Sequence, residues 1–76
     1  MAAKFKQVSG KQLVKALLKA GFVLISQKGS HIKLRKTGDI RMTVIVPNHK
    51  AVRPGTLGNI LRTAEFSRED LEKMLR

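Results

Sequence analysis

The sequence lacks several residue types, and each absence narrows the class of protein. It has no cysteine, which excludes a disulfide-stapled scaffold and a thiolate zinc site and is typical of a reducing cytoplasm. Tryptophan and tyrosine are absent and only three phenylalanines are present, so the core must be built from Leu, Ile and Val. No run approaches the roughly 18 apolar residues that span a membrane. The opening residues MAAKFKQVSG also lack the apolar segment of a signal peptide. We therefore expect a cytoplasmic protein with no membrane partner.

Acidic residues are the other scarce class. The 76 residues include 16 Lys and Arg but only 5 Asp and Glu, which gives a formal net charge of +11. Residues 1–64 carry thirteen positive charges and one negative charge, whereas residues 65–76 carry three positive and four negative charges. Such a field concentrates polyanions at the surface. Nucleic acid is the favoured partner, and a solubilising surface or a membrane-surface patch are the alternatives.

The patterns that are present begin with an amphipathic helix. In SGKQLVKALLKAG, residues 9–21, Ser9 is placed to cap a helix and Gly21 to end it. The helix is expected to pack on the core with its lysines in solvent, although a basic amphipathic helix can also lie on a membrane or a duplex. Its predicted apolar face consists of Leu13, Val14, Leu17 and Leu18.

Three strands are predicted next. FVLISQ (22–27) is short, apolar and β-branched, HIKLRK (31–36) alternates strictly, and IRMTVIVP (40–47) alternates until Pro47 ends it. TGD (37–39) is typical of the turn between the last two strands.

Two further helices complete the predicted order. TLGNILRTA follows the loop NHKAVRPG and places apolar residues at positions i, i+3, i+4 and i+7. SREDLEKMLR starts at Ser67, with Asp70 in the reciprocal position of a capping box. The predicted fold class is α+β: a helix, a three-stranded antiparallel sheet, a helix and a short C-terminal helix, in a single domain over residues 1–76.

The two faces of this sheet are predicted to differ. Helices should cover the apolar face, and the opposite face should be cationic and lack the aromatic pairs on which single-stranded bases stack. The covered face is predicted to hold Ile32, Leu34, Met42, Val44 and Val46, and the open face to hold His31, Lys33, Arg35, Arg41 and Thr43.

Five short motifs follow one another along the chain: SGK, an aromatic residue after KAG, KGSH before a strand, VP with a nearby His, and RPGTLGNIL. In this order the motifs resemble those of the HicA toxins of bacterial and archaeal toxin–antitoxin pairs. The resemblance covers residues 8–75. It implies a fold similar to the double-stranded-RNA-binding domain, and an mRNA interferase that is neutralised by a HicB-type antitoxin. We expect the free toxin to be monomeric.

The resemblance also points to individual residues. The essential histidine of the family follows Gly-Ser and corresponds to His31. Many members have a second His directly after it, where this chain has Ile32, so a mechanism through adjacent histidines is disfavoured. Gly58 and the pair Ala64-Glu65 replace the common arginine and Ala-Gly, which should affect the helix end more than catalysis.

RNA carries its own nucleophile, the 2′-OH, so cleavage needs proton transfer and stabilisation of the charge that develops on the phosphate. Histidine, with an ordinary pKa near 6.5, can act as acid or base at neutral pH. Because the resemblance places the essential histidine of the family at His31, His31 is the predicted catalytic residue, with His49 and Thr56 in possible supporting roles. Thr56, beside Gly55, opens a helix, so it is interpreted either as part of an anion site or as an ordinary helix-capping position. The residues predicted to bind the RNA backbone are Lys28, Gly29, Ser30, Lys33, Arg35 and Arg41.

No metal site or cofactor is predicted, because two histidines and Asp39 are too few ligands in the first 64 residues. The enzyme hypothesis is thus a metal-independent endoribonuclease that acts on mRNA. Its alternative is a non-catalytic module that binds double-stranded RNA or mRNA and blocks translation. DNA binding ranks third, because no helix has the base-reading polar face of a recognition helix.

Overall fold

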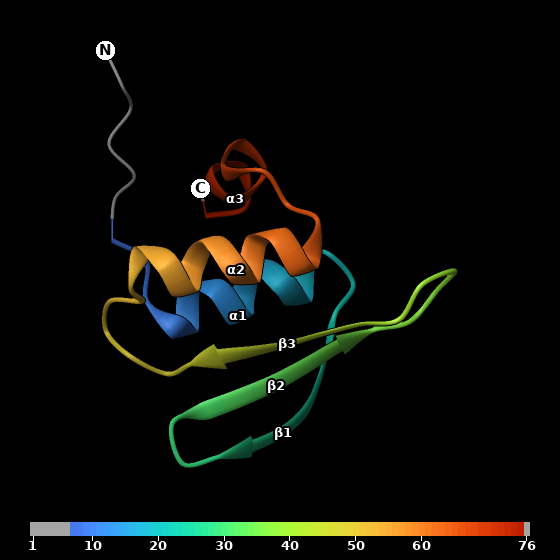
Figure 1. Cartoon of the computed structure of the whole chain (residues 1–76), viewed down its shortest axis with the longest axis horizontal. Helices are drawn as coiled ribbons and strands as arrows, with labels where there is room; N and C mark the ends of the chain where they lie inside the picture. Colours follow the sequence, from blue (N-terminus) through green and yellow to red (C-terminus); the bar gives the residue numbers. More distant parts are fainter. Residues whose placement is uncertain (1–6, 76) are drawn as a thin grey trace.

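The computed structural model describes residues 7–75 and shows a helical layer over a three-stranded sheet (Figure 1). The elements follow the predicted order: α1 (Gly10–Lys19), β1 (Val23–Lys28), β2 (His31–Lys36), β3 (Met42–Pro47), α2 (Pro54–Ala64) and α3 (Arg68–Leu75). α1 and α2 lie side by side above the sheet, and α3 packs farther from it (Figure 1). This arrangement confirms the predicted α+β fold and is consistent with a fold similar to the double-stranded-RNA-binding domain. Among residues 7–75, no helix is long and apolar enough to cross a bilayer.

The sheet is antiparallel throughout, with strand order β1-β2-β3. In the β2–β3 pair His31 lies opposite Pro47, Lys33 opposite Ile45, and Arg35 opposite Thr43. In the β1–β2 pair the register shifts by a bulge between Leu24 and Ser26. Residues that lie directly opposite each other point to the same face, so this register decides which side chains share the open side of the sheet.

The core lies between the helices and the covered face of the sheet. Leu34 and Val46 are fully buried, Ile32 and Val44 nearly so, and Met42 packs against them while partly exposed. The predicted division of β2 and β3 into an apolar and a cationic face is therefore confirmed. Every residue of β1, by contrast, is exposed, and the buried floor of the sheet comes from β2 and β3 alone.

α1 has the predicted ends but a different apolar face. Ser9 caps it in a reciprocal box with Gln12, and Gly21 follows its end with a φ of +104°, a conformation that favours glycine. The core-facing residues are Leu13, Ala16 and Leu17. The prediction for Leu18 was wrong: its side chain is 46% exposed. It lies about 100° around the helix from Leu17 and faces the groove beside β1 instead.

Several element boundaries also differ from those predicted, including the end of β1 at Lys28 rather than 27. β1 starts at Val23 rather than 22, because Phe22 is drawn into the core at 2% exposure. β3 starts at Met42 rather than 40, and Ile40 stays 65% exposed in the preceding turn. α2 starts at Pro54 because proline is well suited to the first helical position, where its missing N–H costs no hydrogen bond.

The junction of α2 and α3 has two capping features. Glu65 is the C-cap residue after the end of α2, and its φ of +59° is a left-handed conformation that ordinarily favours glycine. At the start of α3 the predicted capping box is confirmed. The Ser67 N–H donates to Asp70 Oδ2 at 2.9 Å, and the Asp70 N–H donates to Ser67 Oγ at 3.0 Å.

Candidate active site

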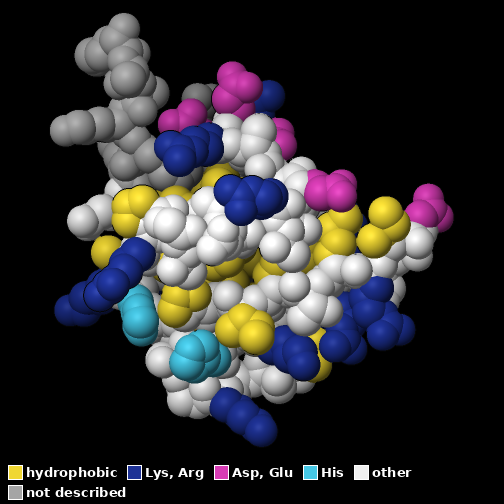
Figure 2. Space-filling view, viewed as in Figure 1, with side chains coloured by type: hydrophobic (Ala, Val, Ile, Leu, Met, Phe, Trp, Pro, Cys, Tyr) yellow, Lys and Arg dark blue, Asp and Glu magenta, His cyan; other side chains and the backbone are white. Residues whose placement is uncertain are grey.

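The open face of the sheet carries the cationic residues that the sequence placed there. Lys33 and Arg35 are half-buried on β2, and Arg35 Nε donates to Thr43 Oγ1 on β3 at 3.2 Å. This bond orients the guanidinium along the sheet surface and leaves its terminal N–H groups for other partners. Figure 2 shows Lys and Arg side chains beside both histidines on one side of the molecule, with acidic side chains along the opposite edge.

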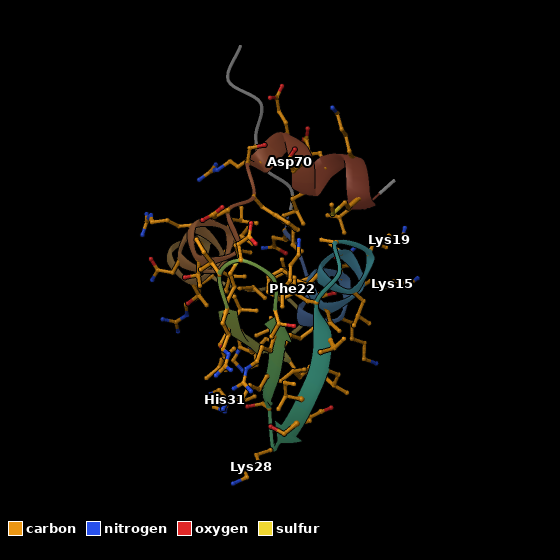
Figure 3. The ribbon with its side chains drawn as sticks, turned by 90° about the vertical axis from the view of Figure 1, so that its right-hand side faces the viewer. Lys15, Lys19, Phe22, Lys28, His31 and Asp70 are labelled. Carbon is orange, nitrogen blue, oxygen red and sulfur yellow. The ribbon has the colours of Figure 1, made fainter. Side chains whose placement is uncertain are left out.

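His31 is exposed at the first position of β2. It follows a two-residue turn in which Gly29 has a φ of +55°, a conformation that L side chains rarely adopt. Lys28 lies opposite His31 in the register and therefore shares its face, while Gly29 and Ser30 are exposed at the tip of the hairpin. Figure 3 places His31 and Lys28 away from Lys15 and Lys19 of α1.

A shallow cavity of about 330 Å³ lies at this end of the sheet, between β3 and the start of α2. It brings together residues that are far apart in the sequence, from β2, β3, the loop after β3 and the first turn of α2. Its lining consists of His31, Ile45, Pro47, His49, Arg53 and Thr56. The cavity therefore contains both histidines of the chain and a cation.

The loop that carries His49 is fixed by backbone hydrogen bonds. The His49 carbonyl accepts from the Gly10 N–H at 2.9 Å, and the His49 N–H donates to the Pro47 carbonyl at 2.9 Å. The Asn48 N–H donates to the Ser30 carbonyl at 2.6 Å, which joins this loop to the turn before His31. The two histidine-bearing segments are thus tied to each other as well as to α1.

The structure brings only part of the predicted site together. His31, His49 and Thr56 share the cavity, whereas Lys33 and Arg35 extend from it along β2. Arg41 was predicted to lie in the third strand, but it comes just before β3, at the far end of the sheet from His31. Arg53 also lines the cavity, although the sequence did not predict it as a site residue. The feature that could have indicated it is its position directly before Pro54, which makes it the N-cap residue of α2.

Carboxylates lie away from this cavity. Asp39 is in the turn at the other end of the β2–β3 hairpin, and the remaining four acidic residues fall between 65 and 72. Within residues 7–75, no three His, Cys, Asp or Glu side chains are grouped to bind a metal ion. The site therefore presents histidines and cations, a combination suited to a phosphate group.

No curated protein matches the chain. The family model of the HicA toxin of bacterial toxin–antitoxin systems matches residues 10–66, which is more than half of the chain. That span runs from the first residue of α1 to just beyond the end of α2, and it includes every residue that lines the cavity. This 76-residue chain therefore belongs to the HicA toxin family.

Proposed function

We propose that the protein is the toxin of a type II toxin–antitoxin system and acts as an endoribonuclease that cuts mRNA without a metal, with His31 as a general acid or base. The observation that carries this proposal is the position of His31. It is exposed in a cavity on the cationic face of the sheet, where a phosphodiester can reach it. A histidine in such a place can transfer a proton at neutral pH, and the surrounding cations would stabilise the charge of the transition state.

The RNA backbone would follow the open face of the sheet. A strand rises about 3.3 Å per residue, so Lys33 is about 7 Å and Arg35 about 13 Å from His31 along β2. These residues and Arg41 would contact phosphates that flank the cleaved bond, and Lys28, Gly29 and Ser30 would contact the strand at the hairpin tip. Thr56 and Arg53, at the positive end of α2, lie nearer to the scissile phosphate.

Cleavage of a single-stranded mRNA in the presence of EDTA tests the enzyme proposal. Wild-type protein should cut the RNA, and His31→Ala should abolish cutting while its unfolding midpoint stays unchanged, because the side chain points away from the core. Lys15→Ala, on the distant surface of α1, is the matched control (Figure 3). Full activity of His31→Ala would refute the assignment.

A non-catalytic RNA-binding role is the second candidate, and it is favoured by the similarity of the fold to double-stranded-RNA-binding domains. It predicts that mRNA binds to the same cationic face and that translation stops without new RNA ends. Retained inhibition of translation by His31→Ala would support this role over the enzyme.

Membership of a toxin–antitoxin family implies an antitoxin partner. We propose that a HicB-type antitoxin with an acidic surface covers His31 and the patch formed by Lys33, Arg35 and Arg41. Charge complementarity would give fast capture of the free toxin, and direct occlusion would prevent RNA binding. Titration of antitoxin into toxin bound to labelled RNA should release the RNA. A ternary complex that keeps RNA at full affinity would show that the antitoxin acts at another site.

A further inference from the structure

We propose that His49 is the second proton-transfer residue of the site. When one of His31 and His49 acts as the general base, the other acts as the general acid. This inference rests on the proposed ribonuclease function and adds the group that a single histidine cannot supply. The two residues are on different elements, but both line the cavity between β3 and α2. Figure 2 shows the two histidine side chains on the same surface of the molecule.

Elimination supports His49 as the partner. The next residue on β2, Ile32, is 6% exposed and packs in the core, and the open-face residues that follow it on β2 are the cations Lys33 and Arg35, so the strand offers no second histidine or carboxylate on that face. The chain has no cysteine, and its carboxylates lie at the other end of the hairpin or on the 65–72 segment. The titratable and charged groups on the elements around His49 are His31 and Arg53, which line the same cavity, Lys50, which is next in the chain, and Lys11, which follows the Gly10 that bonds the His49 carbonyl. Of these, only the histidine has an ordinary pKa near neutrality.

Backbone hydrogen bonds of the loop hold His49 in a fixed position. The Gly10 N–H holds the carbonyl of His49 itself, and the Asn48 N–H holds the carbonyl of Ser30, directly before His31. Three residues after His49, the Val52 N–H donates to the Val8 carbonyl at 2.8 Å. The backbone of His49 is therefore anchored on both sides, and its exposed side chain is the part left to meet a ligand.

The chemistry needs two groups with opposite tasks. One imidazole takes the proton of the 2′-OH as the 2′-oxygen bonds to phosphorus. The other, as imidazolium, gives its proton to the 5′-oxygen as the P–O5′ bond breaks. The products are a 2′,3′-cyclic phosphate and a 5′-OH end, and solvent restores both protonation states. Arg53, on the cavity wall, would stabilise the additional negative charge on the phosphorane oxygens.

The test uses an RNA oligonucleotide that the wild-type protein cuts, made with an ordinary linkage or with sulfur in place of the 5′-bridging oxygen at the cleaved bond. Wild type should show a bell-shaped pH–rate profile, and His49→Ala should lose one limb of it and about 10²–10⁴-fold in rate. A thiolate leaves without protonation. The sulfur substrate should therefore restore the rate of one variant, either His31→Ala or His49→Ala, and leave the other slow.

Controls separate the possible outcomes. Lys50→Ala changes the same loop without touching the cavity lining and should keep the wild-type profile. A His49→Ala protein that keeps both limbs and loses only a few-fold in rate would overturn the assignment of His49 while the function of His31 stands. An inactive wild type would instead remove the ribonuclease function and this inference with it.

Discussion

Gly10 shows how one small residue supports the candidate site. It is buried at the start of α1, directly against the loop after β3. A Cβ at this position would lie 2.8 Å from Asn48 Cα and closer still to the Pro47 carbonyl oxygen. Both are backbone atoms, so no side chain can rotate away to make room. The SGK motif at the start of the family match therefore has a physical reason in this fold.

Gly10→Ala should accordingly destabilise the protein by about 1–3 kcal/mol, the usual cost of overpacking. It should also slow any cleavage that depends on His49, because the Pro47–His49 segment must shift. Urea unfolding and the RNA assay measure the two effects. The matched control is Gly58→Ala, where an added Cβ meets nothing within 4 Å. That variant should be more stable by up to about 1 kcal/mol, since alanine favours helix. Unchanged stability of Gly10→Ala would show that the loop accommodates the methyl group.

Sequence reasoning reached only some residues of the site. The alternation of HIKLRK was enough to place His31, Lys33 and Arg35 on the open face, because side chains of a strand alternate strictly. Arg53 could not be found in that way. It lines the same cavity as His31 only because β3 returns antiparallel to β2 and the following loop folds back to α2, and no local sequence pattern predicts that arrangement.

Among the elements, α3 depends on a charged cap. The Ser67 backbone N–H donates to the Asp70 carboxylate, and this bond is the main reason why the pKa of Asp70 lies below its ordinary value of 3.8. The hydrogen bond with the Ser67 hydroxyl lowers the pKa of Asp70 further. Because the pKa is depressed in the folded state, the stabilisation is present above the unfolded pKa. It is lost as pH falls through the folded pKa.

Asp70→Asn should therefore lower the thermal unfolding midpoint at pH 7, and the difference from wild type should shrink as the pH falls below about 4. Glu72→Gln removes a carboxylate from the same helix without altering the capping box, and it serves as the control. A difference that is constant from pH 7 to pH 2 would mean that the carboxylate charge has no role in the cap.

The strands give a second comparison at the element scale. Leu24 on β1 and Leu34 on β2 are direct cross-strand neighbours, yet Leu24 is 54% exposed and Leu34 is fully buried. Leu34→Ala should cost about 2–5 kcal/mol, whereas Leu24→Ala should cost less than about 1 kcal/mol. Urea unfolding of the two variants checks this. Equal losses would indicate that something covers β1 in solution.

The same pair of leucines shows what the sequence could not predict about the strands, namely which of them the helices cover. An apolar, β-branched run such as FVLISQ predicts a strand, but it does not reveal whether a helix will cover that strand. α1 and α2 cover β2 and β3, so β1 remains an apolar edge, broken by its bulge and ending in Lys28. Alternation predicted the faces of β2 and β3 correctly because one side of each is buried.

At the scale of the whole molecule, positive and negative charges lie on different sides. Acidic side chains gather toward α3, while the histidines and much of the positive charge lie on the other side (Figure 2). A polyanion that approaches such a molecule is drawn to the sheet face, and an acidic protein surface is drawn to the same place. RNA and the antitoxin would thus compete for one surface without a conformational change in the toxin.

The salt dependence of RNA binding tests which cations form that surface. Each phosphate contact releases counterions, so the slope of log affinity against log salt concentration should flatten by about 0.7 for each lost contact with single-stranded RNA. Lys33→Ala, Arg35→Ala and Arg41→Ala should each flatten it by about this amount, and Lys15→Ala, on α1, should leave it unchanged. Arg35→Ala should have the larger effect on affinity if the Thr43 hydrogen bond pre-orients its guanidinium, because less side-chain entropy is then lost on binding. The RNA would instead lie on the helical side of the molecule if Lys33→Ala, Arg35→Ala and Arg41→Ala kept the wild-type slope and Lys15→Ala flattened it.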